Sequence, residues 1–146
     1  MMELMTTINW KTLKYMTLKD NWGDPSKMSK ALVYNLENLR AYCGKPCVLT
    51  CPAYSNSGHA TNSQHALGTA ADIRILHATL LEMYILAERF NFTGIGLYPN
   101  NGRPFIHVDM RPTDPLNVQA RWIAVGDPNN WTYVTLNEEN VRKYVI

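Results

Sequence analysis

The sequence predicts an α+β fold, in which a small antiparallel sheet packs against helices. Two segments have the apolar spacing of amphipathic helices, and several others have the composition of strands joined by short turns. These helices and strands come in separate blocks, unlike the regular alternation of a parallel α/β sheet. With 146 residues and neither an internal repeat nor a linker-like tract, the chain is expected to form one domain, residues 1–146.

The first helix is predicted over residues 24–44. Asp24 can cap its start, Pro25 suits the first helical position because an N–H there would have no partner, and Gly44 ends it. The apolar stripe that is expected to face the core consists of Met28, Leu32, Leu36 and Leu39.

The next predicted element is a strand over residues 47–54, which Pro52 cuts short because proline cannot donate to a sheet ladder. Residues 55–64 are small, polar and rich in turn formers, which predicts an exposed loop of the kind that often carries function. A second helix is expected over residues 78–92, where Thr79 and Glu82 have the spacing of a capping box. Two hairpins should follow, from residues 94–99 with 104–111 and from residues 121–126 with 130–136.

Composition and charge exclude several classes of protein. A chain that is 46% hydrophobic and 18% charged is typical of a globular domain. Its net charge is only +2, and the sequence has no dense basic stripe, so no nucleic-acid partner is expected. No apolar run approaches the ~18 residues of a transmembrane segment, and the first residues lack the basic and apolar parts of a secretory signal. We expect a soluble monomer that is not exported by that route.

Three cysteines recur every four residues, at Cys43, Cys47 and Cys51. Gly44 and Pro46 break any helix that would bring them to one side, and Cys47 and Cys51 on an extended segment would lie ~13 Å apart. Buried or idle thiols are therefore favoured over a Cys43–Cys47 bridge or a metal role.

His65 and Asp72 are a candidate pair of metal ligands. They lie seven residues apart, so a continuous helix cannot join them if both bind one ion. Along a helix this spacing is a rise of ~10 Å, whereas two ligands of one zinc ion lie within ~4 Å of one another. The segment must therefore bend. Gly68 permits a bend, and Ala70 and Ala71 are small enough for a close approach of the backbone.

Strand alternation gives the segments around Asp72 and His107 one polar and one apolar face. The polar face would hold Asp72, Arg74, His107, Asp109 and Arg111, and the apolar face Ile73, Ile75, Ile106, Val108 and Met110. On a common helix layer the two polar faces would form one groove. Two histidines and one aspartate suit zinc, and three protein ligands leave a fourth position for water, as in catalytic sites. Because zinc activates water and polarises carbonyl groups, the implied reaction is hydrolysis of an amide.

Proton transfer requires a further residue. Asp109 lies two positions after His107 on the same face and is the first candidate for the base, with the orientation of a metal ligand as an equal alternative. His59, in the polar loop, is the other candidate, either for proton transfer or for stabilising the tetrahedral intermediate. Arg74 and Arg111 can clamp a substrate carboxylate or be ordinary surface charges.

The stretch SQHALGTAADI fits the pattern serine-x-histidine-x-x-glycine-x-alanine-x-aspartate, and residues 10–125 resemble the zinc D-alanyl-D-alanine carboxypeptidase family. This family includes phage L-alanyl-D-glutamate endolysins and is similar in structure to the hedgehog signalling domain. The resemblance implies a hedgehog-like α+β fold and a peptidoglycan stem peptide as substrate, acted on at the cell wall after release from a bacterial or phage-infected cytoplasm. It also implies Zn²⁺ bound by His65, Asp72 and His107, with Ser63 of the motif as a substrate-binding candidate.

The chain departs from many of these relatives at two positions. Pro104 stands where they place an acidic base three residues before the third ligand, which favours Asp109 for that role, and Tyr54 stands where they carry an arginine. The leading hypothesis is a zinc peptidase that cuts stem peptides as a carboxypeptidase or an endopeptidase, as a phage lysin does. The alternatives are a zinc-containing module that binds such peptides without hydrolysis, and an α+β domain without metal.

Overall fold

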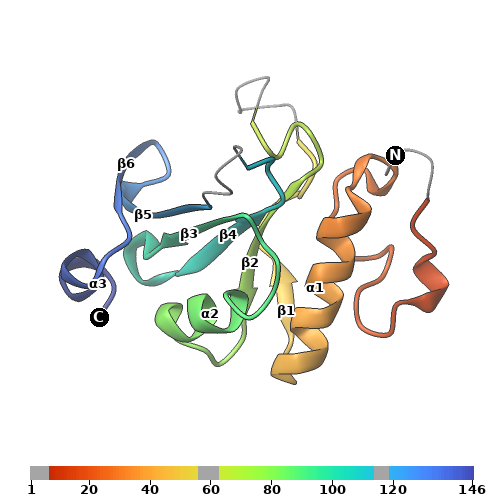
Figure 1. Ribbon diagram of the computed structural model, residues 1–146, viewed down its shortest axis with the longest axis horizontal. Coiled ribbons are helices and arrows are strands. Elements are labelled where there is room, and N and C mark those ends of the chain that lie inside the picture. The colour runs from red at the N-terminus through yellow and green to blue at the C-terminus, as the bar shows by residue number, and fades with distance from the viewer. Residues whose placement is uncertain (1–6, 56–62, 114–118) are drawn as a thin grey trace.

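The computed structural model describes residues 7–55, 63–113 and 119–146. These residues form one sheet of six strands in the order β1-β2-β4-β3-β5-β6, in which only β3 and β5 are parallel neighbours (Figure 1). The predicted α+β class is confirmed. The strands are β1 (Cys47–Leu49), β2 (Ala70–Ile75), β3 (Gly94–Tyr98), β4 (Phe105–Asp109), β5 (Ala120–Asp127) and β6 (Asn130–Thr135). The α-helices are α1 (Lys30–Cys43), α2 (Leu80–Ala87) and α3 (Glu138–Tyr144), and the 3₁₀ helices are η2 (Trp10–Thr12), η3 (Pro25–Lys27) and η4 (Asn100–Gly102).

Helices α1 and α2 pack against one face of the sheet, here called the back face (Figure 1). The sheet residues on this face are fully buried: Ile73, Ile95, Leu97, Ile106 and Val108. They share one core cluster with the apolar sides of the two helices, which consist of Leu32, Leu36, Leu39, Leu80, Met83 and Ala87. Each large aliphatic side chain buried in this way contributes about 1.5–3 kcal/mol. The opposite face, here called the front face, carries the candidate site.

The first predicted helix is divided into two in the structure. Asp24 caps the short helix η3, after which the backbone is extended, and α1 begins only after Ser29. The predicted start at residue 24 is therefore wrong. The Ser29 N–H donates to the carbonyl of Gly68 (2.8 Å), so a tertiary contact interrupts the helix and the Ser29 hydroxyl caps a new one. The predicted end at Gly44 (φ 66°) and the burial of the apolar stripe are confirmed.

The strand predicted over residues 47–54 is shorter in the structure, because β1 ends at Leu49. Thr50 still donates to the carbonyl of Asp72 in β2, but Ala53 and Tyr54 pair with the N-terminal segment instead of the sheet. The N–H groups of Ala53 and Tyr54 donate to the carbonyls of residues 21–22, at 3.0 and 2.7 Å. The segment that follows β1 is therefore held by the chain that precedes α1.

The second helix and both hairpins are confirmed. Thr79 and Glu82 form the predicted capping box at the start of α2, although the helix ends at Ala87 rather than at residue 92. Helix α3 was not predicted. Most of the predicted loop over residues 55–64 lies outside the described residues. Among the residues that are described, no helix has the length and apolar character needed to cross a membrane.

Candidate metal centre

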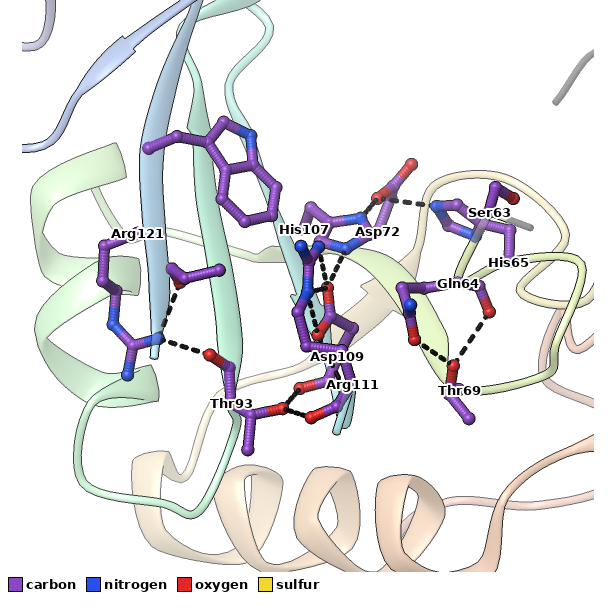
Figure 2. A network of polar contacts seen from close by, with 12 residues as sticks. Ser63, Gln64, His65, Thr69, Asp72, Thr93, His107, Asp109, Arg111 and Arg121 are labelled. Carbon is purple, nitrogen blue, oxygen red and sulfur yellow. Dashed lines mark hydrogen bonds and ion pairs between the residues drawn. The ribbon is translucent and has the colours of Figure 1, made fainter. Parts of the chain in front are cut away.

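Three side chains from two strands and one turn converge on the front face (Figure 2). Strand β2 pairs with β4 so that Asp72 lies opposite His107, and the turn before β2 brings His65 beside them. The Oδ1 atom of Asp72 lies 3.4 Å from His65 Nε2 and 3.1 Å from His107 Nδ1. One possible ligand atom from each residue lies within 4.8 Å of the other two, so a single metal ion can contact all three.

A tight turn over residues 65–69 positions His65. Gly68 has a φ of 74°, and a Cβ atom at this position would lie 1.9 Å from the carbonyl oxygen of Lys27. Only glycine satisfies both the backbone conformation and this close approach. The N–H groups of Gly68 and Thr69 donate to the carbonyls of His65 (3.2 Å) and Gln64 (3.0 Å), which closes the turn. The bend predicted at Gly68 is confirmed.

In each histidine, the ring nitrogen that points away from Asp72, here called the outer nitrogen, faces a hydrogen-bond acceptor. His65 Nδ1 lies 3.0 Å from the carbonyl oxygen of Ala53, which can only accept, so this nitrogen carries the proton. His107 Nε2 lies 2.7 Å from a carboxylate oxygen of Asp109. With a metal ion bound, the lone pairs of His65 Nε2 and His107 Nδ1 would point to the ion beside Asp72. Metal-binding histidines have this pattern, since the outer N–H fixes the orientation of the ring.

The charges of the site favour a cation between the carboxylates of Asp72 and Asp109. Burial would raise the pKa of Asp72, but hydrogen bonds from His107 and His65 bring it well below its usual range. Burial would lower the pKa of His107, but hydrogen bonds to Asp109 and Asp72 raise it to about 9. Burial would also raise the pKa of Asp109, but hydrogen bonds from His107 and Arg111 bring it below its usual range. Asp72 and Asp109 are thus both ionised at neutral pH, and the positive charge between them can be that of a proton or of a metal ion.

Asp109 lies behind His107, on the far side of the ring from Asp72 (Figure 2). Its carboxylate is fully buried and also accepts hydrogen bonds from the Arg111 guanidinium, at 2.6 Å from Nη2 and 2.9 Å from Nε. A Cβ atom at Gly94, on the neighbouring strand, would lie 2.3 Å from this carboxylate. The glycine therefore makes the room that Asp109 occupies.

Trp122 of β5 covers the other flank of His107. Its ring lies 5.3 Å from the His107 ring, and the Arg111 guanidinium stacks on it at 5.0 Å. A Cβ atom at Gly96 would lie 2.3 Å from the indole. Arg121 fixes the start of β5 by donating to Glu88 (2.8 Å) and to the carbonyl of Thr93 (3.0 Å), so Trp122 is held in place from the next residue.

Sequence reasoning missed Trp122 and both glycines of the GIG stretch in β3. A signal was present, because two glycines spaced by two residues in a strand indicate close approach on one face. Which side chains approach them depends on the pairing of β3 with β4 and β5, which the sequence does not state.

These residues border a cleft of about 490 Å³. Among the described residues it is lined by Ser63, Gln64, His65, Asp72, Tyr98, Phe105, His107, Arg111, Trp122, Pro128, Trp131 and Tyr133. Of the predicted substrate-binding residues, Ser63 and Arg111 lie in the cleft. Arg74 is not among the described lining residues, and its guanidinium donates to the carbonyls of residues 103–104. His59 lies outside the described residues.

All three cysteines are free thiols, and one of them contacts the site. The Cys51 thiol donates to Oδ2 of Asp72 at 3.4 Å. Burial and the neighbouring carboxylate raise the pKa of this thiol to about 12, so it stays protonated and keeps donating. Cys51 therefore contacts Oδ2 of Asp72, whereas both histidines contact Oδ1.

The model of one peptidase family, described as peptidoglycan L,D-endopeptidase MepK, matches residues 46–114. The matched segment starts just before β1 and runs past β4, so it contains His65, Asp72, His107 and Asp109. This match confirms the resemblance to the zinc peptidases of the M15 family. Neither the curated proteins nor the solved structures gave a significant match.

Proposed function

We propose that the chain, whose residues 46–114 match the model of a peptidase M15 family, is a zinc-dependent peptidase that hydrolyses amide bonds in peptidoglycan peptides. The observation that carries this proposal is the convergence of His65, Asp72 and His107 within 4.8 Å of one another, inside the matched segment and in the lining of a cleft. The family match supports the substrate class, and the geometry supports the metal.

The three residues fit zinc by their chemistry. Two neutral imidazoles and one carboxylate form a ligand set of catalytic zinc sites, in which one position is left for water or substrate. His65 would bind through Nε2, Asp72 through Oδ1 and His107 through Nδ1, since these atoms face one another. When bound, zinc supplies activation of water and polarisation of the scissile carbonyl.

We assign Asp109 to positioning rather than to proton transfer. Its carboxylate accepts from His107 Nε2 and from Arg111, and it is not among the described residues that line the cleft. A base must reach the proton that it removes, and the buried Asp109 has the His107 ring between itself and the ligand atoms. His59 is therefore our candidate for proton transfer, with Arg111 and Ser63 in reach of a substrate carboxylate.

The description of the family as an L,D-endopeptidase favours a cut inside a peptide over removal of a terminal residue. We therefore propose endopeptidase activity, with carboxypeptidase activity as the competing possibility. A setting in phage lysis is proposed only from the resemblance of the central motif to phage endolysins.

A second candidate function is a metal-containing module that binds peptidoglycan peptides without cutting them. One observation favours it. Among the described residues that line the cleft, Asp72 is the only carboxylate, and it is already engaged by two histidines and Cys51.

Digestion of purified peptidoglycan, read by mass spectrometry, separates these functions. The proposed enzyme should release defined peptide fragments, lose this activity with a chelator and regain it with Zn²⁺. The mass of each fragment identifies the bond that is cut. Stoichiometric zinc and peptide binding without any released fragment would establish the binding module instead, and activity that is unaffected by a chelator would refute the metal.

A further inference from the structure

We infer that the cleft has a second subsite, which binds the sugar rings of peptidoglycan beside the peptide that is cut. This inference rests on the proposed function and specifies its substrate: a stem peptide that still carries its sugars. The subsite consists of four aromatic residues, here called the aromatic platform: Tyr98, Phe105, Trp131 and Tyr133.

Three of the four rings of the aromatic platform are in contact. Tyr98 and Phe105 are stacked, with ring centroids 4.6 Å apart and planes 14° from parallel. Trp131 meets Tyr98 edge-on, at 5.1 Å and 88°. These rings come from β3, β4 and β6, so three strands are needed to bring them together. The arrangement is a continuous aromatic surface on the front face.

This surface is continuous with the candidate metal centre. Trp122 packs against His107 at one end, and its indole N–H donates to the Tyr98 hydroxyl (3.3 Å) at the other. The metal-ligand candidates and the aromatic platform line the same cleft. A volume of about 490 Å³ lies within the range of about 300–1,000 Å³ that is usual for ligand pockets.

The hydrophobic core does not account for the aromatic platform. None of its four residues belongs to the core cluster or packs against it, whereas other aromatic side chains, such as Trp22 and Phe92, do. Tyr133 is 59% exposed and lies on the edge strand β6. Large rings on an exposed edge favour unwanted association, so their gathering at a cleft indicates a ligand.

The chemistry of peptidoglycan identifies that ligand. The side chains of its stem peptides are methyl groups, carboxylates and amines, and none of them needs an extended aromatic surface. Its sugar rings have broad C–H faces and acetamido methyl groups, with polar hydroxyl groups at the edges. Aromatic rings with a polar edge, such as tyrosine and tryptophan, suit a ligand that is apolar on its face and polar at its rim.

The distance along the sheet also fits. His107 is in register with Thr135 of β6, three strand spacings or ~14 Å away, and Trp131 lies four residues from Thr135 along β6. The aromatic platform therefore extends from ~8 Å (Tyr98) to ~20 Å (Trp131) from His107. An extended peptide covers ~3.4 Å per residue, so peptides of about two to six residues span this range. A stem peptide of that length would connect a bond at the metal centre to a sugar on the aromatic platform.

Matched substrates test this inference. Cross-linked peptide dimers that carry the disaccharide are compared with the same dimers after the sugars have been removed by an amidase. We expect kcat/KM to be at least about tenfold higher with the sugars, a factor that corresponds to one or two ring-stacking contacts. Trp131→Ala should lower kcat/KM on the sugar-bearing dimer at least about tenfold more than on the sugar-free dimer, which removes the preference, and Trp131→Phe should retain most of it.

Tyr42→Ala is the matched control, since Tyr42 is 55% exposed but lies outside the cleft-lining residues, and it should keep the full preference. Equal kcat/KM on both substrates, or an equal loss on both in Trp131→Ala, would overturn the sugar subsite.

A direct binding measurement separates this inference from the proposed function. The disaccharide without peptide is titrated against the whole chain, with tryptophan fluorescence as the readout. Saturable binding that Trp131→Ala weakens at least about tenfold supports the subsite even if no peptide is cut, in which case only the proposed activity fails. Absence of disaccharide binding, together with equal cleavage of both substrates, rejects the subsite and leaves the peptidase intact.

Discussion

Buried side chains lie on both faces of the β2–β4 pair, but different interactions hold them in place. On the back face, Ile73 and Ile106 are fully buried among other apolar side chains and are held by packing. On the front face, His107 is 7% exposed and Asp109 is fully buried, but hydrogen bonds and ion pairs hold them.

This difference predicts different consequences of mutation. Loss of an apolar side chain leaves a cavity whose cost is spread over many neighbours. Loss of one polar partner leaves a buried charge without compensation, which is costly at that point. The back face should therefore control stability, and the front face should control metal binding and chemistry.

The largest effect is expected from Asp72→Asn, which keeps the shape of the side chain but removes its charge. Loss of a residue that only orients a metal ligand costs about 10–100-fold in metal affinity or activity. Loss of a ligand itself should therefore lower turnover by at least about a thousandfold. Metal analysis and the peptidoglycan digest measure the two losses. His77→Asn is the matched control, since His77 is exposed and asparagine tolerates its φ of 65°. Stoichiometric zinc in Asp72→Asn would mean that the front face is not the metal site.

Ile73→Ala changes the adjacent residue on the opposite face. We expect unfolding to become easier by about 2–5 kcal/mol, because a fully buried side chain leaves a cavity. Zinc content and turnover per folded molecule should not change. Urea denaturation and metal analysis of the same sample test the comparison. A loss of zinc as large as that in Asp72→Asn would show that the faces are not separable.

Asp109→Asn tests whether the carboxylate behind His107 orients this metal ligand or acts as the catalytic base. An orienting carboxylate predicts that zinc affinity falls about 10–100-fold and that excess zinc restores part of the turnover. A catalytic base predicts the opposite pattern, with zinc retained and turnover lost at every zinc concentration. Zinc titration monitored by activity distinguishes the two, and retention of full affinity would return Asp109 to the role of base.

The smallest expected effect is that of pH, and it has opposite signs for two quantities. The pKa of His107 rises from 6.5 to about 9 in the metal-free protein. Its protonated form therefore stabilises the metal-free fold fully below pH 6.5, and this stabilisation is lost as the pH rises through 9. Zinc must displace the same proton, so zinc affinity should weaken by up to about tenfold per pH unit below 9. Thermal unfolding of the apoprotein and zinc titration between pH 6 and 9 should show these opposite trends, and parallel trends would contradict the assignment.

The strand faces could be predicted from sequence because alternation along β2 and β4 is a local property. Asp72 and Ile73 point to opposite faces in any strand, and the geometry of zinc then required the bend at Gly68. The start of α1 could not be predicted in this way. Asp24 and Ser29 are both good capping residues, and the contact between Ser29 and the Gly68 carbonyl decides between them.

The roles of Gly94, Gly96 and Trp122 depend on strand order, which a local pattern does not contain. The parallel pairing of β3 with β5 sets Gly96 beside Trp122, although the two strands belong to different hairpins. The aromatic platform depends in the same way on β3, β4 and β6. Residues that a short motif places together could therefore be predicted, and those that only the complete sheet brings together could not.

The close contact between Gly68 and Lys27 has a consequence for protein engineering. His65 owes its position to a turn that rests on the backbone just before α1, and Ala53, which orients the His65 ring, is itself bonded to Asn21. An excised fragment of residues 46–114 would contain every ligand but neither of these supports. The smallest active piece should therefore begin upstream of residue 21, and grafting the histidine motif alone onto another scaffold would transplant the ligands without their alignment.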